Sequence, residues 1–224
     1  MKLFLAASLL IGLCAAPRAF AAPLTRADAI AIAVSFAEYK WQPVAKNVRH
    51  GKDADGIEVH TPDASTGNPD LWQAGQPTIG VPYKWGGFDS LESFERGIRA
   101  GKAGGDLYSA EKRRLGGKAV SGSCVGLDCS GFISRCWRLT EKQSTSSLEG
   151  LCAKLRSVSE LRPGDVLNTP GGHVVMFFKW LDNTQTRFLC YEAEPFSRVR
   201  CSERNAAEMT AIGYTPLRYR KIVD

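Results

Sequence analysis

Apolar residues recur at helical spacing in three stretches of the chain. The first stretch follows a capping-box pattern at Thr25 and Asp28 and runs until Pro43, which ends the helix. Its apolar positions fall on one helical face and are Ile30, Val34, Ala37 and Trp41. We expect this helix to pack on the rest of the protein rather than to bind a separate partner.

The second stretch begins at Asp128, whose carboxylate can cap a helix by accepting from the free N–H groups of the first turn. Apolar residues then recur at helical spacing as far as Leu139, namely Phe132, Ile133, Cys136 and Trp137. The third stretch, Ser90 to Lys118, predicts two short helices that end at Gly116-Gly117. It is basic, which is typical of a solvated face or of a lid whose cations meet substrate carboxylates.

Two apolar runs in the C-terminal half, Val174–Trp180 and Thr186–Ala193, predict neighbouring β-strands. Between them, Asp182-Asn183 tolerates the positive φ angles of a two-residue hairpin turn. The segment from Ser197 to Asp224 is expected to supply closing strands. The chain is therefore predicted to be an α+β protein in which the helix after Asp128 packs against an antiparallel sheet.

Residues 44–76 are rich in Gly, Asp, Pro and Thr, which predicts an extended loop that wraps the protein or forms part of a cleft wall. Its two histidines, His50 and His60, have no metal-ligand spacing to a second His or Cys, so we expect both at the surface. Trp72 is expected to place its ring on the core.

Cys129 is the first candidate for chemistry, because it would lie in the first turn of the helix that Asp128 caps. The positive end of the helix dipole favours a thiolate there, and the thiolate is the nucleophilic form of cysteine. Ser130 and Gly131 are small and leave room for a substrate backbone to approach. Cysteines at helix starts are common, so this pattern gains meaning only with a partner base.

His173 is the candidate base, 44 residues further along the chain. It follows the turn Pro170-Gly171-Gly172 and precedes the apolar strand that begins at Val174. A side chain in this position is held by the strand, faces a cleft and can take a proton from Cys129. The alternative is a hydrogen-bonded structural histidine at a strand end.

A carboxylate could orient this histidine. If Asp182-Asn183 form the hairpin turn, Glu192 faces His173, whereas a slip of two residues would put Glu194 there. Both carboxylates point to the same face of the strand. We favour Glu192 because the shorter turn is the commoner one, and its charge would stabilise the imidazolium as the third member of a triad does.

An aromatic segment precedes these residues. Tyr83 and Trp85 share one face of the stretch Gly80–Gly87 if it is extended, and its glycines allow close backbone approach. A Tyr83 hydroxyl near the thiolate could help to hold an oxyanion. The alternative is an aromatic core plug, for which Trp85 is the better candidate.

These segments together resemble the NlpC/P60 family of cell-wall cysteine peptidases. The matching pieces occur in the family's order, over roughly residues 76 to 195, and are Val81–Gly87, Asp128–Phe132, Leu161–Val166 and Gly172–Phe177. The resemblance implies a papain-like fold with Cys129 as nucleophile and His173 as base. It also implies a polar third residue on the following strand and a Tyr83 that lines the site near the nucleophile.

The resemblance also implies a function, the hydrolysis of amide bonds in bacterial peptidoglycan stem peptides, and favours the bond between γ-D-glutamyl and a diamino acid. Two alternatives stay open. The same chemistry could act on the bond between muramic acid and L-alanine or on a peptide crosslink. The chain could instead be a non-catalytic wall-binding or inhibitor-like module on a retained fold.

The chain departs from the family pattern at two places. About 40 residues separate Gly87 from Asp128, more than is usual in the family, so we expect an insertion at about residues 88–122 to shape the substrate cleft. The third position carries Glu192 where the family more often has His. A carboxylate there still accepts from the imidazole N–H, so orientation of the ring is preserved.

The first 21 residues have the pattern of a secretory signal peptide, with Lys2, an apolar centre from Leu3 to Ala16 and small residues at Ala19 and Ala21. Leu13 before Cys14 disfavours lipid attachment. The protein is therefore expected to be periplasmic or secreted, with no membrane-spanning segment after signal removal. We assign residues 22–75 to an N-terminal helix and wrapping loop, and residues 76–224 to the catalytic domain.

Charge and cysteines limit the partners further. Signal removal takes away two cations, Lys2 and Arg18, and no acid, so the formal net charge falls from +6 to +4 (6 − 2). No basic stripe is interleaved with aromatic residues, so nucleic acid is not an expected partner. We expect no cofactor, and no zinc site because there is no Cys-x-x-Cys and His173 serves better as a base.

Six cysteines remain after export, an environment that permits disulfides. They are Cys124, Cys129, Cys136, Cys152, Cys190 and Cys201. The pairings suggested by the predicted elements are Cys190 with Cys201 and Cys136 with Cys152, while a bond between Cys124 and Cys129 would switch the enzyme off. The connectivity does not follow from the sequence.

Overall fold

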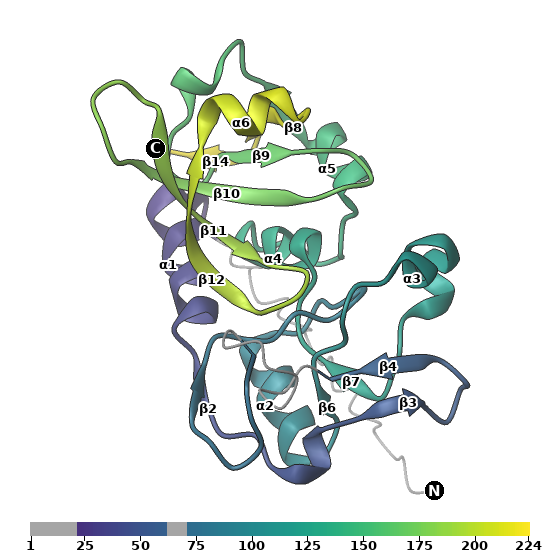
Figure 1. Ribbon diagram of the computed structural model, residues 1–224. Coiled ribbons are helices and arrows are strands. Elements are labelled where there is room, and N and C mark those ends of the chain that lie inside the picture. The colour runs from purple at the N-terminus through teal and green to yellow at the C-terminus, as the bar shows by residue number, and fades with distance from the viewer. Residues whose placement is uncertain (1–21, 62–70) are drawn as a thin grey trace, which may run out of the picture.

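A computed structural model describes residues 22–61 and 71–224 of the chain (Figure 1). The predicted signal peptide, residues 1–21, lies outside the described residues. Within them, no helix has the length and apolar character needed to cross a membrane.

A six-stranded antiparallel sheet lies in the upper half of Figure 1, with the strand order β12-β11-β10-β9-β13-β8. Its strands in chain order are β8 (Cys152–Lys154), β9 (Val166–Asn168), β10 (Val174–Trp180), β11 (Arg187–Ala193), β12 (Val199–Asn205) and β13 (Thr215–Tyr219). The mixture of helices with an antiparallel sheet agrees with the predicted α+β class.

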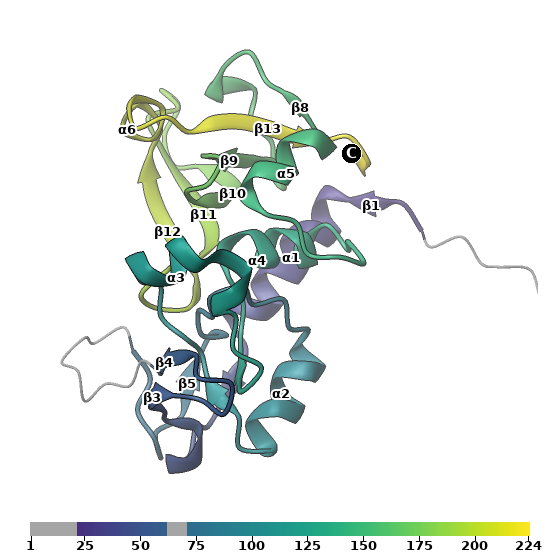
Figure 2. The ribbon, with the colours of Figure 1, turned by 90° about the vertical axis from the view of Figure 1, so that its right-hand side faces the viewer.

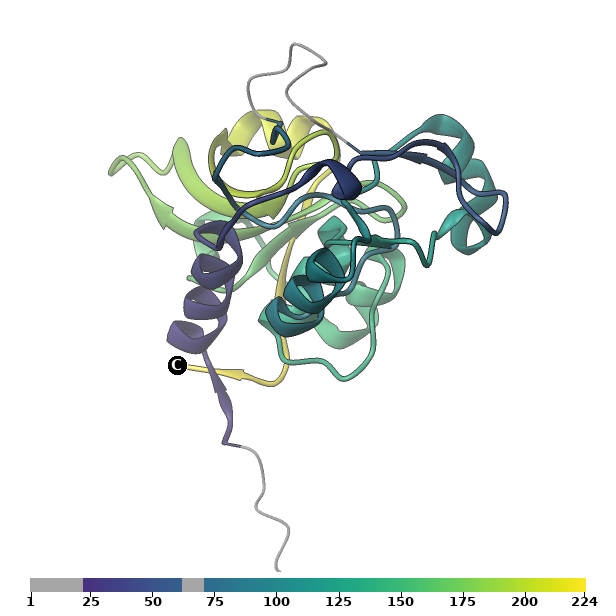
Figure 3. The same ribbon diagram turned by 90° about the horizontal axis from the view of Figure 1, so that it is seen from below.

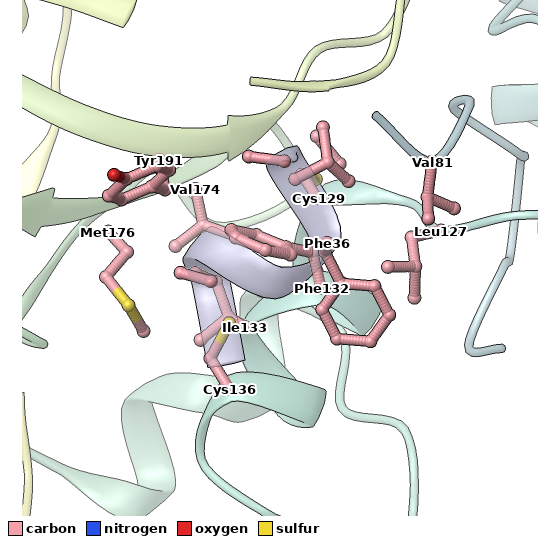
Figure 4. Close-up of a cluster of buried hydrophobic side chains, with 14 of the residues drawn as sticks. Phe36, Val81, Leu127, Cys129, Phe132, Ile133, Cys136, Val174, Met176 and Tyr191 are labelled. Atoms are coloured by element: carbon pink, nitrogen blue, oxygen red, sulfur yellow. The ribbon is translucent and has the colours of Figure 1, made fainter. Parts of the chain in front are cut away.

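Helix α4 (Cys129–Cys136) packs against β10 and β11 of this sheet. Its fully buried side chains Phe132 and Ile133 belong to the same core cluster as Val174 and Met176 (Figure 4). The helix ends before Leu139, where the apolar pattern ended, because Arg138 has a φ of 53° and leaves the helical conformation. The predicted element and its packing on the sheet are confirmed.

Helix α1 (Arg26–Ala37) begins at the predicted capping box, and Thr25 and Asp28 each accept from the other's backbone N–H. The predicted apolar face is only partly right, because Ala37 is buried as predicted but the other buried helix residues are Ala29, Ala33 and Phe36, while Ile30 and Val34 are half-buried. Trp41 is buried but lies in β2 (Lys40–Trp41), since the helix ends at Ala37 rather than at Pro43. Small alanines let α1 approach the body of the protein closely. Phe36 then packs edge to face on Phe132 of α4, with ring centroids 6.2 Å apart.

The segment predicted as a wrapping loop contains several short elements. They are η1 (Ala45–Asn47), β3 (His50–Lys52), β4 (Glu58–His60) and, just beyond the segment, β5 (Thr78–Ile79), which pairs with β2 (Lys40–Trp41). In the β3–β4 hairpin, His50 pairs with His60, and both are exposed as predicted. Trp72 is buried and its indole N–H donates to the Gly104 carbonyl at 2.9 Å, which confirms its place on the core.

The insertion folds into the two predicted short helices, α2 (Leu91–Arg99) and α3 (Ala110–Leu115), followed by η3 (Gly116–Ala119). Between the helices, β6 (Ala103–Gly104) pairs in parallel with β7 (Cys124–Val125). Figures 1 and 2 both show α3 at the level of α4, between the large sheet and the β3–β4 hairpin. The insertion therefore forms part of the same body as helix α4.

Four further elements complete the C-terminal half of the chain. They are α5 (Thr145–Leu151), η4 (Val158–Glu160), α6 (Ala206–Ala211) and β14 (Ile222–Val223). Helix α6 was not predicted; Asn205 caps it by accepting from the N–H groups of Ala207 and Glu208. Strand β14 pairs in parallel with β1 (Leu24–Thr25), so the two ends of the described chain lie side by side (Figure 3).

Two helical glycines provide a test of how closely α4 is packed. A Cβ added at Gly131 in α4 would lie 2.0 Å from the Gly87 carbonyl oxygen, whereas one at Gly150 in α5 would meet nothing within 4 Å. We expect Gly131→Ala to lower the free energy of unfolding by about 1–3 kcal/mol, because overpacking shifts the backbone. Gly150→Ala should raise it by about 0.5–1 kcal/mol, because alanine favours the helix. Urea unfolding of both variants measures this, and changes of the same sign would contradict it.

Candidate active site

Cys129 is the first residue of α4, as predicted, and Asp128 is its N-cap. The Asp128 carboxylate accepts from the Gly131 N–H at 2.6 Å. Figure 4 shows Cys129 at the start of the helix, beside the core side chains that anchor α4, and the residue is 7% exposed. The packed helix therefore holds the sulfur atom at the border of the core.

His173 directly precedes β10, as predicted, and its carbonyl oxygen accepts from the Thr169 N–H across the preceding turn at 2.9 Å. Its Nε2 atom lies 2.8 Å from Glu192 Oε2. Its Nδ1 atom is buried and is not bound by Glu192. The ring is thus oriented through Nε2, and Cys129 interacts with the same imidazole.

Cys129 and Glu192 both act electrostatically on this imidazole. Burial by itself lowers the pKa of His173, but the charges and hydrogen bonding of Cys129 and Glu192 outweigh burial and raise the pKa to about 10. Burial raises the pKa of Glu192, yet the hydrogen bond from His173 and the charges of His173 and Arg204 bring it below its usual value. The site therefore favours a charged imidazolium beside a charged carboxylate.

Arg204 on β12 is a residue of the site that sequence reasoning missed. Its guanidinium donates to Glu192 Oε1 at 2.5 Å, so Glu192 has a basic partner on each carboxylate oxygen. Glu192 is fully buried, and an unpaired charge there would be strongly destabilising. The sequence does not predict a role for Arg204, because its partner Glu192 lies on a neighbouring strand, β11, and no local sequence motif links the two residues.

The hairpin turn predicted at Asp182-Asn183 is wrong. In the structure Leu181 N–H donates to the Arg187 carbonyl, and the Asp182 carboxylate accepts from the backbone of Thr186 and Arg187, so the loop is longer. The pairing of Met176 with Tyr191, continued to His173, would bring Glu194 opposite it. Glu192 nevertheless reaches the ring diagonally, and Glu194 instead pairs with Arg200 at 3.2 Å.

The polar side chains at the start of α4 form hydrogen bonds and an ion pair with one another and with Lys142. Ser130 Oγ donates to Asp128 Oδ1 at 3.1 Å, and Lys142 Nζ lies 2.9 Å from Asp128 Oδ2 and 3.2 Å from Ser130 Oγ. These contacts fix the first turn of α4. Asp128 and Ser130 therefore support the helix that carries Cys129. The expectation that Gly131 leaves room for substrate is wrong, because the space at its Cα is filled by the Gly87 carbonyl.

Tyr83 is almost fully buried and lies near Cys129. Burial raises the pKa of its hydroxyl well above the usual value, and the charges of Cys129 and Asp128 raise it further. The hydroxyl therefore keeps its proton and can act as a hydrogen-bond donor. The charge of Tyr108 also acts on Tyr83, so the insertion brings an aromatic residue to this side of the site.

Several cations of the insertion pair with acids of the insertion itself. Lys112 is buried, pairs with Asp106 at 2.7 Å and donates to the Glu58 carbonyl at 2.5 Å. Arg96 and Arg99 pair one helical turn back with acids of α2. These contacts favour a structural role for the three cations over the alternative of a lid that meets substrate carboxylates.

Tyr214 is a second residue that sequence reasoning missed. Burial raises the pKa of its hydroxyl to about 12, together with the charges of Glu192 and Cys129. Tyr214 and His173 line one open pocket of about 540 Å³, formed with β12 and α6. The site therefore has a hollow next to its histidine.

The six cysteines of the described residues are free thiols. The register of β11 and β12 pairs Cys190 with Ser202 and Tyr191 with Cys201, so Cys190 and Cys201 point to opposite faces of the sheet. The suggested bond between these two therefore does not fit the register, while the pairing of Cys136 with Cys152 stays a prediction. In the part of the chain that is described, no group of three or more His, Cys, Asp or Glu residues could hold a metal ion.

Comparisons of the chain with models of protein families, with curated proteins and with solved structures found no match. The functional interpretation therefore depends on the geometry of the site and on the sequence motifs.

The contact between the histidine and the thiol is open to a chemical test. At neutral pH we expect His173→Gln to slow alkylation of Cys129 by iodoacetamide roughly tenfold or more, because no base is left to take the thiol proton. Glu192→Gln should slow it as well, whereas the matched variant Glu194→Gln should not. Peptide mass spectrometry reads each cysteine separately, and an unchanged rate in His173→Gln would contradict the assignment.

The raised pKa of His173 also predicts how stability depends on pH. The histidine titrates at 6.5 in the unfolded chain and at about 10 in the folded protein, so the folded state binds this proton more tightly. Its contribution to stability is fully present below pH 6.5 and is lost as the pH rises towards about 10. We expect the free energy of unfolding to fall across this window more steeply in the wild type than in His173→Gln, and equal slopes would contradict this.

Proposed function

We propose that this protein is an exported cysteine hydrolase with a papain-like fold of the NlpC/P60 kind, and that it cleaves amide bonds in bacterial peptidoglycan stem peptides. The observation that carries the proposal is the arrangement of three side chains. His173 is held by Glu192 through Nε2, and the same imidazole interacts with Cys129, with Nδ1 not bound by Glu192. Nucleophile, base and orienting group are the parts that covalent amide hydrolysis requires.

The proposed reaction has two halves. Before the attack, the Cys129 thiol passes its proton to His173, which gives the imidazolium that the site favours, and the thiolate then attacks the carbonyl carbon of the amide. Collapse of the tetrahedral intermediate breaks the carbon–nitrogen bond, and His173 returns the proton to the leaving amine, which leaves a thioester on Cys129. A water molecule, deprotonated by His173, then attacks the thioester, and release of the carboxylic acid regenerates the thiol.

Two groups are candidates to hold the oxyanion of the tetrahedral intermediate. The Tyr83 hydroxyl keeps its proton and lies close enough to Cys129 to be affected by its charge. At the helix start, the Gly131 N–H is already bound by Asp128 and the Asp128 N–H by the Gly87 carbonyl. The Cys129 N–H is therefore our candidate for the backbone donor.

The substrate class has separate support. Four segments around the site resemble the NlpC/P60 family, and residues 1–21 have the pattern of an export signal, which suits action on a cell wall. The formal net charge of +4 after signal removal suits an anionic polymer. Within this class we favour the bond between γ-D-glutamyl and a diamino acid.

Digestion of purified peptidoglycan tests the proposal. We expect the wild type to release peptides and Cys129→Ala to lower the rate by more than about 10³-fold, because the covalent route is lost. The matched control Cys201→Ala, which removes an exposed thiol, should keep full activity.

The masses of the released fragments identify the bond, and so separate a γ-D-glutamyl endopeptidase from an amidase acting next to muramic acid. Equal release by the wild type and Cys129→Ala would contradict the hydrolase. Binding to peptidoglycan without any release would favour the non-catalytic module.

A further inference from the structure

Two exposed histidines face each other across the β3–β4 hairpin. His50 is the register partner of His60, although the two are far enough apart in the sequence that their spacing gave no sign of a contact. The next pair along the ladder is hydrogen-bonded, because the Thr61 N–H donates to the Arg49 carbonyl at 2.8 Å. Hydrogen-bonded and non-hydrogen-bonded pairs alternate in an antiparallel ladder, so His50 and His60 form a non-hydrogen-bonded pair, the kind in which side chains lie closer. The centroids of their rings are 6.1 Å apart.

This arrangement of two imidazoles is suited to a metal ion. An ion about 2.1 Å from one nitrogen of each ring requires ring centroids roughly 5 Å apart. The two rings therefore need to approach by only about 1 Å, which small rotations of exposed side chains provide. Among divalent ions, imidazole nitrogen suits Zn²⁺, Cu²⁺ and Ni²⁺.

A carboxylate lies beside the pair. Glu58 and His60 stand on the same face of β4, since Val59 between them points to the opposite face and is fully buried. Glu58 Oε1 is 3.6 Å from His60 Nε2. A histidine that binds a metal usually donates its other ring N–H to a carboxylate or carbonyl, which fixes the tautomer and orients the ring. Glu58 is placed to take this role for His60.

The hairpin is anchored at both ends, so the two histidines are already side by side. At its turn, the Asp53 carboxylate accepts from the N–H groups of Asp55 and Ile57, each at 2.9 Å. At its other end, the His60 carbonyl accepts from the Leu107 N–H at 3.0 Å. Ligands that are held near their bound positions lose little conformational entropy when an ion binds.

We propose that His50 and His60 form a surface site for a divalent late transition-metal ion, with the two imidazoles as protein ligands, Glu58 orienting His60, and water completing the coordination. Only two side chains bind the ion, so the site does not need a group of three or more ligand residues, which the described part of the chain lacks. A bound ion joins β3 to β4 and stabilises the hairpin. The site is independent of the proposed hydrolase, because neither histidine takes part in that chemistry.

Calorimetric titration with NiCl₂, on protein without a histidine tag, tests the site. We expect the wild type to bind one Ni²⁺ ion, and His50→Gln and His60→Gln each to weaken binding roughly tenfold or more, because the second ligand is no longer held close to the first. Glu58→Gln should weaken binding by a smaller factor. The matched control His173→Gln, which removes the third histidine of the chain, should bind Ni²⁺ as the wild type does.

Thermal unfolding gives a second readout. Ni²⁺ should raise the Tm of the wild type and of His173→Gln, but not that of the two hairpin variants, because a ligand stabilises only a folded state that binds it. The Tm values without metal verify that each variant is folded. No Ni²⁺ binding by the wild type, or equal affinity in the wild type and His50→Gln, would overturn the site. Loss of binding in His173→Gln alone would put the ion at the active site instead, and an unchanged affinity in Glu58→Gln would overturn the role of Glu58.

Discussion

The contact between His173 Nε2 and Glu192 Oε2, at 2.8 Å, is the interaction on which the site depends. A fully buried carboxylate is costly unless each oxygen is paired, and Arg204 supplies the second partner. With both oxygens bound, Glu192 has little freedom to turn, and it holds the imidazole through Nε2. The fold therefore determines which nitrogen of the histidine faces the carboxylate and which one does not.

The other half of the site depends on how closely α4 is packed. Its first turn lies against the Gly87 backbone, its apolar side meets β10 and β11, and α1 lies against it through Phe36 and Phe132. These contacts leave the sulfur little room to move. The cluster of Asp128, Ser130 and Lys142 neutralises the cap at the helix start. Cys129 and His173 are therefore each held rigidly, by segments that lie far apart in the sequence.

Cations of the insertion contribute to the fold. Lys112 is buried against Asp106, and the arginines of α2 pair with acids of their own helix.

Features that depend on neighbouring residues were predicted from the sequence alone. They are the cap at Asp128, the helix that carries Cys129, the turn before His173, and the alternation that puts Glu192 and Glu194 on one face. Contacts between distant segments were not predicted. Glu192 was chosen correctly from an incorrect turn, because the longer loop after Leu181 shifts the register and only a diagonal approach of the side chain restores the pair. No local sequence motif predicts the contact of Arg204 with Glu192 or the place of Tyr214 near the site. The same holds for the Gly87 carbonyl that fills the space at Gly131. Each of these depends on a strand, helix or loop that folding brings close. The sequence determined which residues could do the chemistry, because their type and immediate neighbours set their local conformation. The tertiary structure decided which of them meet and what neutralises their charge, because burial and pairing are properties of distant parts of the chain placed together.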